Sequence, residues 1–237
     1  MMPSFLPARL WRMVGKVIRL PLRLIPPGSI VRILSGPLRG CRWIVGAGVH
    51  EVWIGTYERA KVSRVQASLR AGDVFYDVGA HAGIYSLAAA RAVGDTGTIV
   101  AIEPNPINAA HFVRHMELNR VKSVRLLSVA ASDTVGSATF GRGPNSYEGR
   151  LQPQGQLAVE TIRLDDIQPA ATVIKIDVEG HEANVLRGAE HILDRNRPKV
   201  FVATHDPQSR AQCVQILEAH DYQVRWLDAN DLFAFPY

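Results

Sequence analysis

A glycine turn follows a short apolar stretch in the first half of the chain. Residues 74–78 are apolar apart from Asp77, and Gly79 and Gly83 follow before an alanine-rich stretch. An apolar strand that runs into a glycine turn and then a helix is the front of a nucleotide-binding α/β unit. A pyrophosphate in such a turn needs bare backbone N–H groups, and the carboxylate of Asp77 would repel it. The turn therefore favours a cationic ligand over a dinucleotide.

A second carboxylate, Glu103, comes directly after the next apolar stretch, residues 98–102. At this distance beyond the turn, a carboxylate can accept hydrogen bonds from the hydroxyls of a ribose. S-adenosylmethionine (SAM) carries a ribose, an ammonium group and a sulfonium group, and it has no phosphate. Asp77 and Glu103 together therefore indicate a SAM site. The turn also resembles a dinucleotide fingerprint in which His81 replaces the middle glycine, so an NAD-dependent oxidoreductase acting on nucleotide sugars is the alternative.

Two further carboxylates, Asp177 and Glu179, follow a third apolar stretch, residues 172–176. Residues two apart in extended backbone point to the same side, and Gly180 permits a sharp turn afterwards. The pair can orient an acceptor hydroxyl and take its proton, or it can hold a divalent cation together with an imidazole. His205 follows another apolar stretch and is the candidate imidazole, although it also fits a hydrogen-bonded histidine near a helix start.

The elements that would position these residues alternate between strands and helices. The expected strands are 74–78, 98–102, 124–129, 172–176 and 199–203, and the expected helices are 82–93, 105–119, 181–193 and 206–220. This order predicts parallel strands with right-handed crossovers, whose carboxyl ends would carry the candidate residues. Asn105 and Asp206 precede prolines and are predicted helix N-caps, whereas Glu182 is interpreted as an acid that favours a helix N-terminus.

The alternation of strands and helices is interrupted between the third and fourth expected strands. Residues 137–140 and 158–163 are predicted to be additional strands. Between them, residues 141–156 are rich in glycine and proline and show no periodicity, which predicts a loop. A loop of this length inside a compact domain is typical of a lid or a substrate-binding segment.

Composition excludes several classes of protein. The chain has 237 residues and is 47% apolar, which is typical of one globular domain with a substantial core. Cys41 and Cys213 lie far apart, so neither a disulfide framework nor a zinc site is expected, and a reducing cytoplasm is the default compartment. No apolar run has the length needed to cross a bilayer, and we expect no signal peptide.

Charge is distributed unevenly along the chain. Residues 1–50 contain eight of the 27 Lys and Arg residues and none of the 22 Asp and Glu residues. Nucleic-acid binding would spread positive charge over the rest of the chain, so no nucleic-acid partner is expected. Five basic residues recur at spacings of three and four: Arg9, Arg12, Lys16, Arg19 and Arg23. On a helix they form one basic face, which either lies on an anionic inner-membrane surface or is solvated while the apolar side packs on the domain.

Several motifs carry a resemblance to a known family. The most specific are Asp77-Val-Gly-Ala-His-Ala-Gly83, Glu103-Pro-Asn105 and Lys175-Ile-Asp-Val-Glu-Gly-His-Glu182, with support from Gly55-Thr-Tyr-Glu58 and Arg163-Leu-Asp-Asp166. Over about residues 35–205 the chain resembles the FkbM family of SAM-dependent methyltransferases. The resemblance implies an α/β class I methyltransferase fold: a Rossmann-like, seven-stranded, mostly parallel sheet with an antiparallel last strand, helices on both faces and a small N-terminal extension. It also implies O-methylation, commonly of hydroxyls on sugars, glycolipids or polyketide-derived rings.

The resemblance also implies a role for individual residues. The expected cofactor-binding residues are Asp77, Gly79, Ala80, His81, Gly83, Glu103, Asn105, Ala131 and Asp133. The expected catalytic residues are Asp177, Glu179 and His205, and the expected acceptor-binding residue is Glu58. Asp133 fits a turn-forming role equally well. The expected organisation is a basic arm at 1–28, a β/helix cap region at 29–70 and a SAM-binding domain at 71–237.

Motifs of other methyltransferase classes are absent from the sequence, and this limits the class of acceptor group. Amino-group methylation often uses an Asn-Pro-Pro-Tyr type of turn, and this chain has Asp177-Val-Glu-Gly180 at that position. Cytosine C5 methylation needs a nucleophilic cysteine, and neither cysteine is near an expected site strand. A hydroxyl acceptor on a carbohydrate or glycolipid is therefore expected. A non-catalytic binding protein of the same fold is the third interpretation, and it would have no need for four carboxylates at one edge of a sheet.

Overall fold

The computed structural model describes residues 24–142, 149–152 and 154–237. The predicted basic helix containing Arg9 and Arg23 lies outside the described residues. So do residues 143–148 and 153 of the predicted loop. Within the described part of the chain, no helix combines the length and the apolar character needed to cross a bilayer.

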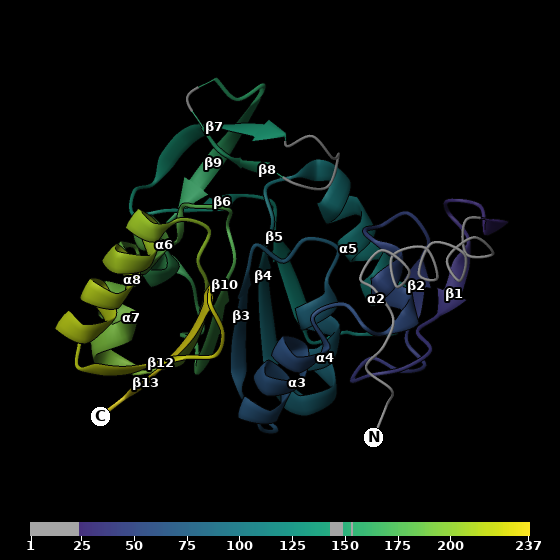
Figure 1. Ribbon diagram of the computed structural model, residues 1–237, viewed down its shortest axis with the longest axis horizontal. Coiled ribbons are helices and arrows are strands. Elements are labelled where there is room, and N and C mark those ends of the chain that lie inside the picture. The colour runs from purple at the N-terminus through teal and green to yellow at the C-terminus, as the bar shows by residue number, and fades with distance from the viewer. Residues whose placement is uncertain (1–23, 143–148, 153) are drawn as a thin grey trace, which may run out of the picture.

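A seven-stranded sheet forms the centre of the molecule (Figure 1). Its strands are β3 (Val74–Val78), β4 (Thr98–Ile102), β5 (Val124–Leu127), β10 (Val173–Ile176), β11 (Lys199–Ala203), β12 (Tyr222–Trp226) and β13 (Asp231–Pro236). Their order across the sheet is β12-β13-β11-β10-β3-β4-β5, and β13 is antiparallel to both of its neighbours. The predicted mostly parallel sheet with an antiparallel last strand is confirmed.

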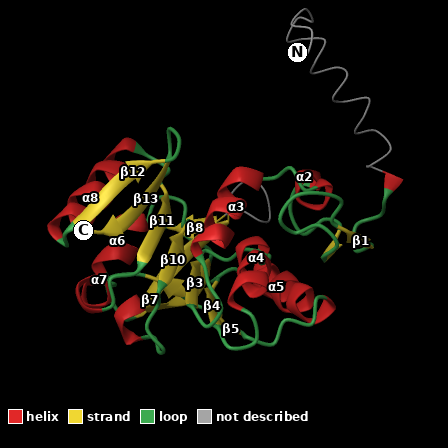
Figure 2. Cartoon of the chain, turned by 90° about the horizontal axis from the view of Figure 1, so that it is seen from below, coloured by secondary structure: helices red, strands yellow, loops and turns green. Residues whose placement is uncertain are grey.

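Helices cover both faces of this sheet (Figures 1 and 2). One face carries α3 (Arg59–Ser68), α4 (Ile84–Val93) and α5 (Pro106–Leu118). The other carries α6 (Glu182–Arg187), α7 (Glu190–Arg195) and α8 (Pro207–Ala219). Two separate clusters of buried apolar side chains result, one on each face, and burial of such clusters is the main force that stabilises the layers.

A small N-terminal unit packs beside α5. It contains the antiparallel strands β1 (Ile30–Arg32) and β2 (Arg42–Ile44) and the helix α2 (His50–Ile54). His115 of α5 is fully buried, stacks on Trp43 at 3.8 Å and accepts a hydrogen bond from the Ile44 N–H at 3.0 Å. Its Nδ1 lies 2.8 Å from the Ala82 carbonyl, to which it donates because the other nitrogen is an acceptor. Burial lowers the pKa of His115 to about 4.

The helix expected over 181–193 is two helices, α6 and α7. The chain bends at Gly188, where a side chain would overlap the carbonyl oxygen of Ser132. Asp165 stabilises the new helix start, because its carboxylate accepts hydrogen bonds from the N–H groups of His191 and Ile192 at 3.1 and 2.9 Å. Asp165 is distant in sequence from the helix it caps, so the local sequence did not reveal the break.

A second sheet lies over the carboxyl ends of the central strands (Figure 1). Its strands are β6 (Ala130–Ala131), β7 (Gly136–Arg142), β8 (Gly149–Leu151) and β9 (Leu157–Ile162), in the order β6-β9-β7-β8. The two additional strands predicted here are confirmed. The prediction that 141–156 is a loop throughout is wrong, because Gly149–Leu151 pairs with β7 in antiparallel register and Leu151 packs on buried Phe140.

Candidate active site

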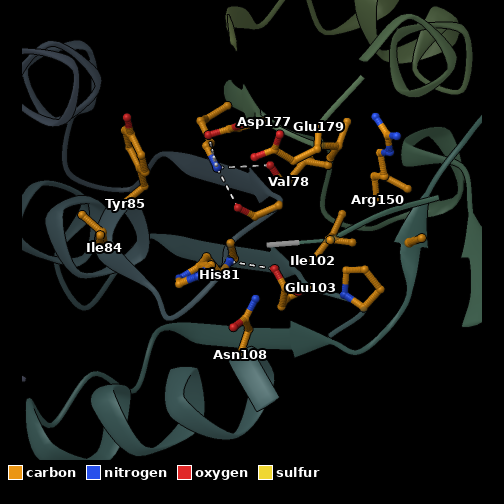
Figure 3. A pocket seen from close by; sticks show the side chains of 18 of the residues that line it. Val78, His81, Ile84, Tyr85, Ile102, Glu103, Asn108, Arg150, Asp177 and Glu179 are labelled. Carbon is orange, nitrogen blue, oxygen red and sulfur yellow. Dashed lines mark hydrogen bonds and ion pairs between the residues drawn. The ribbon is translucent and has the colours of Figure 1, made fainter. Parts of the chain in front are cut away.

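The candidate residues converge at the carboxyl edge of the central sheet. In the parallel register, Asp77 of β3 lies opposite Lys175 of β10 and Ala101 of β4, so the strand ends of β3, β4 and β10 are level. A cavity of about 420 Å³ opens at this edge, a size typical of small-molecule sites. Figure 3 shows Asp177 and Glu179 on one side of the cavity and Glu103 on the other.

Eight of the thirteen predicted site residues line the cavity: Glu58, Gly79, Ala80, His81, Glu103, Ala131, Asp177 and Glu179. Five do not: Asp77, Gly83, Asn105, Asp133 and His205. His205 nevertheless lies 3.4 and 3.5 Å from two of the lining carboxylates, those of Asp177 and Glu179. The other four lie behind the cavity wall, and each has a structural partner.

The glycine turn is pressed against the end of β10. Gly79 has a φ of 75°, and a side chain there would overlap the carbonyl oxygen of Asp177. The N–H groups of Gly79 and Ala80 donate to the Ile102 carbonyl at 2.9 and 3.0 Å. Only glycine combines this backbone conformation with so close an approach. The turn, β4 and β10 therefore form one continuous cavity floor.

Asp77 is buried beneath this floor and pairs with a lysine. Its carboxylate accepts a hydrogen bond from Ser86 at 2.7 Å and lies 3.4 Å from Lys175 Nζ. Burial alone would lower the pKa of Lys175, but the carboxylates of Asp77 and Asp177 raise it, so the lysine is charged. Lys175 also donates to the Gly79 carbonyl at 2.8 Å. Asp77 thus supports the glycine turn through Lys175, and it is not among the residues that line the cavity.

Glu103 presents a buried carboxylate to the cavity. One oxygen accepts the His81 N–H and the other accepts the Asn105 N–H, each at 2.8 Å (Figure 3 shows the first). Burial raises the pKa of Glu103 to about 7, although these hydrogen bonds and the one from Asn108 oppose the rise. A carboxylate has about four acceptor positions and three are used here, so Glu103 can still accept a hydrogen bond from a ligand.

His205 lies between three carboxylates. Its Nδ1 is 2.7 Å from Oε1 of Glu182, and its Nε2 is 3.4 Å from Oδ1 of Asp177 and 3.5 Å from Oε2 of Glu179. The hydrogen bond with Glu182 and the nearby negative charges outweigh partial burial and raise the pKa of His205 to about 9. Glu182 is fully buried and also accepts hydrogen bonds from Ser209 and from the Gly180 N–H.

The remaining predicted residues have clear structural contacts. Gly83 is the N-cap residue of α4, and a side chain there would press on Phe112 of α5. Asn105 is fully buried and caps α5. Asp133 accepts hydrogen bonds from Ser132 and Asn184, which agrees with the turn-forming alternative.

Glu58 faces the cavity from the N-terminal side. Its carboxylate accepts a hydrogen bond from Tyr85 at 2.9 Å and lies 3.3 Å from Lys61 Nζ. The φ of Glu58 is 42°, an uncommon left-handed conformation outside glycine. Such backbone conformations cluster at functional sites.

Several cavity residues were not predicted. Asn108, His181, Arg150 and Lys175 line it, and Glu182 contacts His205 from behind. Lys175 interrupts an otherwise apolar strand, and this signal was available in the sequence because a buried lysine needs an anionic partner. Asn108 lies in the first turn of α5, three residues after the N-cap Asn105. Arg150 has no comparable signal, because it lies in the segment expected to be a loop.

Residues 77–229 match the family described as "Methyltransferase FkbM domain". The chain belongs to the FkbM methyltransferase family. The match covers more than half of the chain and includes the glycine turn, Glu103, Asp177, Glu179 and His205. The protein is therefore a SAM-dependent methyltransferase, and the alternative of an NAD-dependent oxidoreductase is wrong.

The similarity to a sugar methyltransferase agrees with this assignment. The chain is 27% identical over 128 residues to the hexuronic acid methyltransferase AglP of Haloferax volcanii. The aligned region covers 51% of this chain and 52% of AglP, so the chain matches about half the length of this relative.

Solved structures share the fold. The methyltransferase FkbM from Methylobacillus flagellatus has a TM-score of 0.52 at 22% identity, over 70% of this chain and 44% of that one. A SAM-dependent O-methyltransferase from Thermotoga maritima has a TM-score of 0.53 at 14% identity, over 91% of this chain and 80% of that one. At these identities the likeness concerns the fold, which is that of class I methyltransferases.

The cavity fits the methyl donor that the family uses. The carboxylate of Glu103 can accept ribose hydroxyls, and the backbone at Gly79 and Ala80 leaves room beside it because neither residue carries a long side chain. Ile102 and Ala131 add an apolar surface suited to a purine ring. SAM has no phosphate, so the carboxylates at this edge of the sheet do not repel it as they would repel a dinucleotide.

Proposed function

We propose that this enzyme transfers the methyl group of SAM to a hydroxyl of a sugar, free or in a glycan or glycolipid. The observation that carries the proposal is the convergence of Asp177, Glu179 and His205 beside the glycine turn. A hydroxyl is a weak nucleophile and needs a hydrogen-bond acceptor for its proton, which these carboxylates supply. The name of the relative AglP, a hexuronic acid methyltransferase, supports a sugar acceptor.

The cofactor would be held by residues on one side of the cavity. Gly79, Ala80 and His81 would contact the methionine part through backbone groups, and Glu103 would accept the ribose hydroxyls. Ala131, together with the unpredicted Asn108, would lie near the adenine. Lys175 would keep the glycine turn in place from behind, because it donates to the carbonyls of Val78 and Gly79.

The acceptor would lie between Glu58 and the pair Asp177 and Glu179. SAM supplies an already activated methyl group, so that the C–O bond forms as the C–S bond breaks and the hydroxyl proton is released. The chain's own task is to orient the hydroxyl and receive that proton. Because the pKa of His205 is raised to about 9, the imidazole carries a proton at neutral pH, and a carboxylate of Asp177 or Glu179 is the better acceptor.

The test is methyl transfer to a panel of sugars and oligosaccharides, with products identified by mass spectrometry and NMR. Asp177→Asn keeps the shape of the side chain and removes its charge. We expect turnover to fall by about a hundredfold or more, with affinity for S-adenosylhomocysteine nearly unchanged. Glu218→Gln on the exposed side of α8 is the matched control and should behave as the wild type. Full turnover in both Asp177→Asn and Glu179→Gln would show that this site assignment is wrong.

We also propose a three-part organisation: the basic arm 1–28, the cap region 29–70 and the methyltransferase domain 71–237. The proposal for the arm rests on its charge pattern, which suits an anionic membrane surface where lipid-linked glycans are found. The intact chain should pellet with anionic liposomes more completely than a chain lacking residues 1–25. Equal pelleting of the two would refute a membrane role for the arm.

A further inference from the structure

We propose that Asp177, Glu179 and His205 form a binding site for one divalent cation of the Mg²⁺ or Mn²⁺ class, placed where the acceptor hydroxyl must lie. The inference rests on the proposed function, since two of the three residues line the cavity assigned to the acceptor. It adds a bound ion and a second way of activating the hydroxyl, neither of which is required for methyl transfer from SAM.

The spacing of the ligand atoms fits a shared ion. One carboxylate oxygen from Asp177, one from Glu179 and a ring nitrogen of His205 all lie within 4.8 Å of one another. Nε2 of His205 is 3.4 Å from Oδ1 of Asp177 and 3.5 Å from Oε2 of Glu179. Atoms that each bind one ion at about 2.0–2.2 Å are separated by about 2.8–3.1 Å at neighbouring corners of an octahedron and by about 3.3–3.6 Å around a tetrahedron. Both distances from the ring nitrogen match the tetrahedral separation and exceed the octahedral one by about 0.3–0.7 Å, so these side chains would move slightly closer together around an octahedral ion.

The imidazole is fixed from its far side by a residue outside the ligand set. Nδ1 of His205 makes a short contact of 2.7 Å with Glu182, whose side chain is fully buried and held by Ser209 at 2.6 Å and by the Gly180 N–H at 2.8 Å. A carboxylate on the far nitrogen orients a metal-binding histidine and makes it a stronger ligand. Glu182 does not line the cavity. An ion bound at Nε2 of His205 would explain why a buried carboxylate is placed behind the imidazole.

The contacts of the near nitrogen are not hydrogen bonds of ordinary length. N–H···O hydrogen bonds have lengths of about 2.7–3.2 Å, and both distances from Nε2 exceed this range. The ring nitrogen therefore points at the gap between two carboxylate oxygens instead of pairing closely with either one. An ion in that gap would take the place of the proton on Nε2.

The local charge also favours a cation. Three carboxylates, from Asp177, Glu179 and Glu182, surround one imidazole. Lys175 lies 4.0 Å from Oδ2 of Asp177 and is shared with Asp77. Lys175 approaches Oδ2, and Oδ1 remains directed at His205. Two carboxylate oxygens with one imidazole, and no thiolate, suit a hard ion such as Mn²⁺ or Mg²⁺.

Such an ion would bind the acceptor hydroxyl at one of its open positions. Coordination lowers the pKa of a bound hydroxyl and orients its oxygen, which eases loss of the proton during methyl transfer. A sugar with two neighbouring hydroxyls could bind through both oxygens, and this predicts a preference for acceptors with vicinal hydroxyls.

The test is Mn²⁺ binding to the full-length chain after EDTA treatment and dialysis, followed by electron paramagnetic resonance of free Mn²⁺. We expect one ion per chain, displaced by excess Mg²⁺. Glu179→Gln, whose side chain is 47% exposed and so tolerates the change, should lower the affinity at least tenfold. Glu182→Gln should lower it by about 10–100-fold, the usual effect of removing the carboxylate behind a metal-binding histidine. Glu218→Gln on α8 is the control and should bind as the wild type does.

Two results would overturn the inference. One is a wild-type chain that binds no Mn²⁺ at millimolar concentration in the presence of S-adenosylhomocysteine. The other is binding that Asp177→Asn, Glu179→Gln and the control leave equally unchanged. Either result would refute the metal site. If sugar methylation also persists in EDTA, the proposed function is unaffected. If the wild type binds Mn²⁺ at this site but methylates none of the sugars tested, the result would instead count against the proposed function alone.

Discussion

Glu103→Gln tests the assignment of the ribose site. The substitution keeps the size of the side chain but replaces one carboxylate oxygen with an amide that cannot accept a hydrogen bond. Both oxygens already accept a backbone N–H at 2.8 Å and Asn108 donates a further hydrogen bond, so the remaining lone pair is available to the ribose. A hydrogen bond to a charged group contributes about 1.5–3 kcal/mol, so the Kd for S-adenosylhomocysteine should rise roughly 10–150-fold.

The measurement is isothermal titration calorimetry at pH 8.5, where Glu103, with a pKa of about 7, is ionised. A ligand that donates hydroxyl hydrogens favours the ionised form, so wild-type affinity should fall by up to about tenfold per pH unit below 7. The variant should lack this dependence. Its unfolding curve must be recorded as well, because the amide also faces a buried N–H and is expected to cost about 1–3 kcal/mol of stability.

A ligand without the 2′-hydroxyl separates binding from folding. The wild type should bind 2′-deoxy-S-adenosylhomocysteine more weakly than S-adenosylhomocysteine, and the variant should distinguish the two much less. This double comparison isolates the contact between Glu103 and the ribose. Equal discrimination by both proteins, or an unchanged Kd in Glu103→Gln, would refute the assignment.

Three further changes test the supporting structure. Gly79→Ala should abolish S-adenosylhomocysteine binding in calorimetry, because the new methyl group would overlap the Asp177 carbonyl at a φ of 75°. Lys175→Met should lower the free energy of unfolding in urea by about 3–5 kcal/mol, because the buried carboxylate of Asp77 loses its ion pair, and adding Asp77→Asn should restore part of the loss. His115 has a pKa lowered to about 4 from 6.5, so the unfolded chain takes up its proton first as the pH falls. Stability should therefore decline between pH 6.5 and 4 by up to roughly 3 kcal/mol, and the urea midpoint of His115→Asn should vary less over this range.

Local signals in the sequence predicted much of the fold. Asn105 accepts the Ile107 N–H at 3.0 Å and Asp206 accepts the Gln208 N–H at 2.9 Å, as expected of N-caps followed by proline. Caps and apolar strand runs depend on neighbouring residues, and their positions are therefore visible in the chain. The split between α6 and α7 depends on Asp165, a distant residue, and was not predicted.

Some site residues could likewise be predicted from the local sequence, and others depend on tertiary structure. Glu103, Asp177 and Glu179 follow strand ends directly, so the parallel order alone places them at one edge. The partner of Asp77 depends on the register between β3 and β10, which sets Lys175 opposite Asp77. The sequence alone does not give this register, so the pairing of Asp77 with Lys175 was not predicted.

Glu182 shows a further limit. An acid in the first turn of a helix is explained well by the helix dipole, and the sequence gives no reason to look further. Its contact with His205 requires α6 and the start of α8 to lie side by side, and α7 and β11 separate them in the chain. Tertiary packing thus gives a role to a residue that local preference had already explained.

The four-stranded sheet above the cavity is built from one continuous stretch, residues 130–162. Its first strand, β6, pairs with its last, β9, so the chain enters and leaves this sheet at adjacent points. An insertion or deletion between those points can change the sheet without displacing β10 or the glycine turn. Phe140, Gly149 and Leu151, which form the outer wall of the cavity, can therefore be exchanged as one cassette. This topology lets the outer wall of the cavity vary through changes in a single segment of the chain, while Glu103 and the glycine turn lie outside that segment.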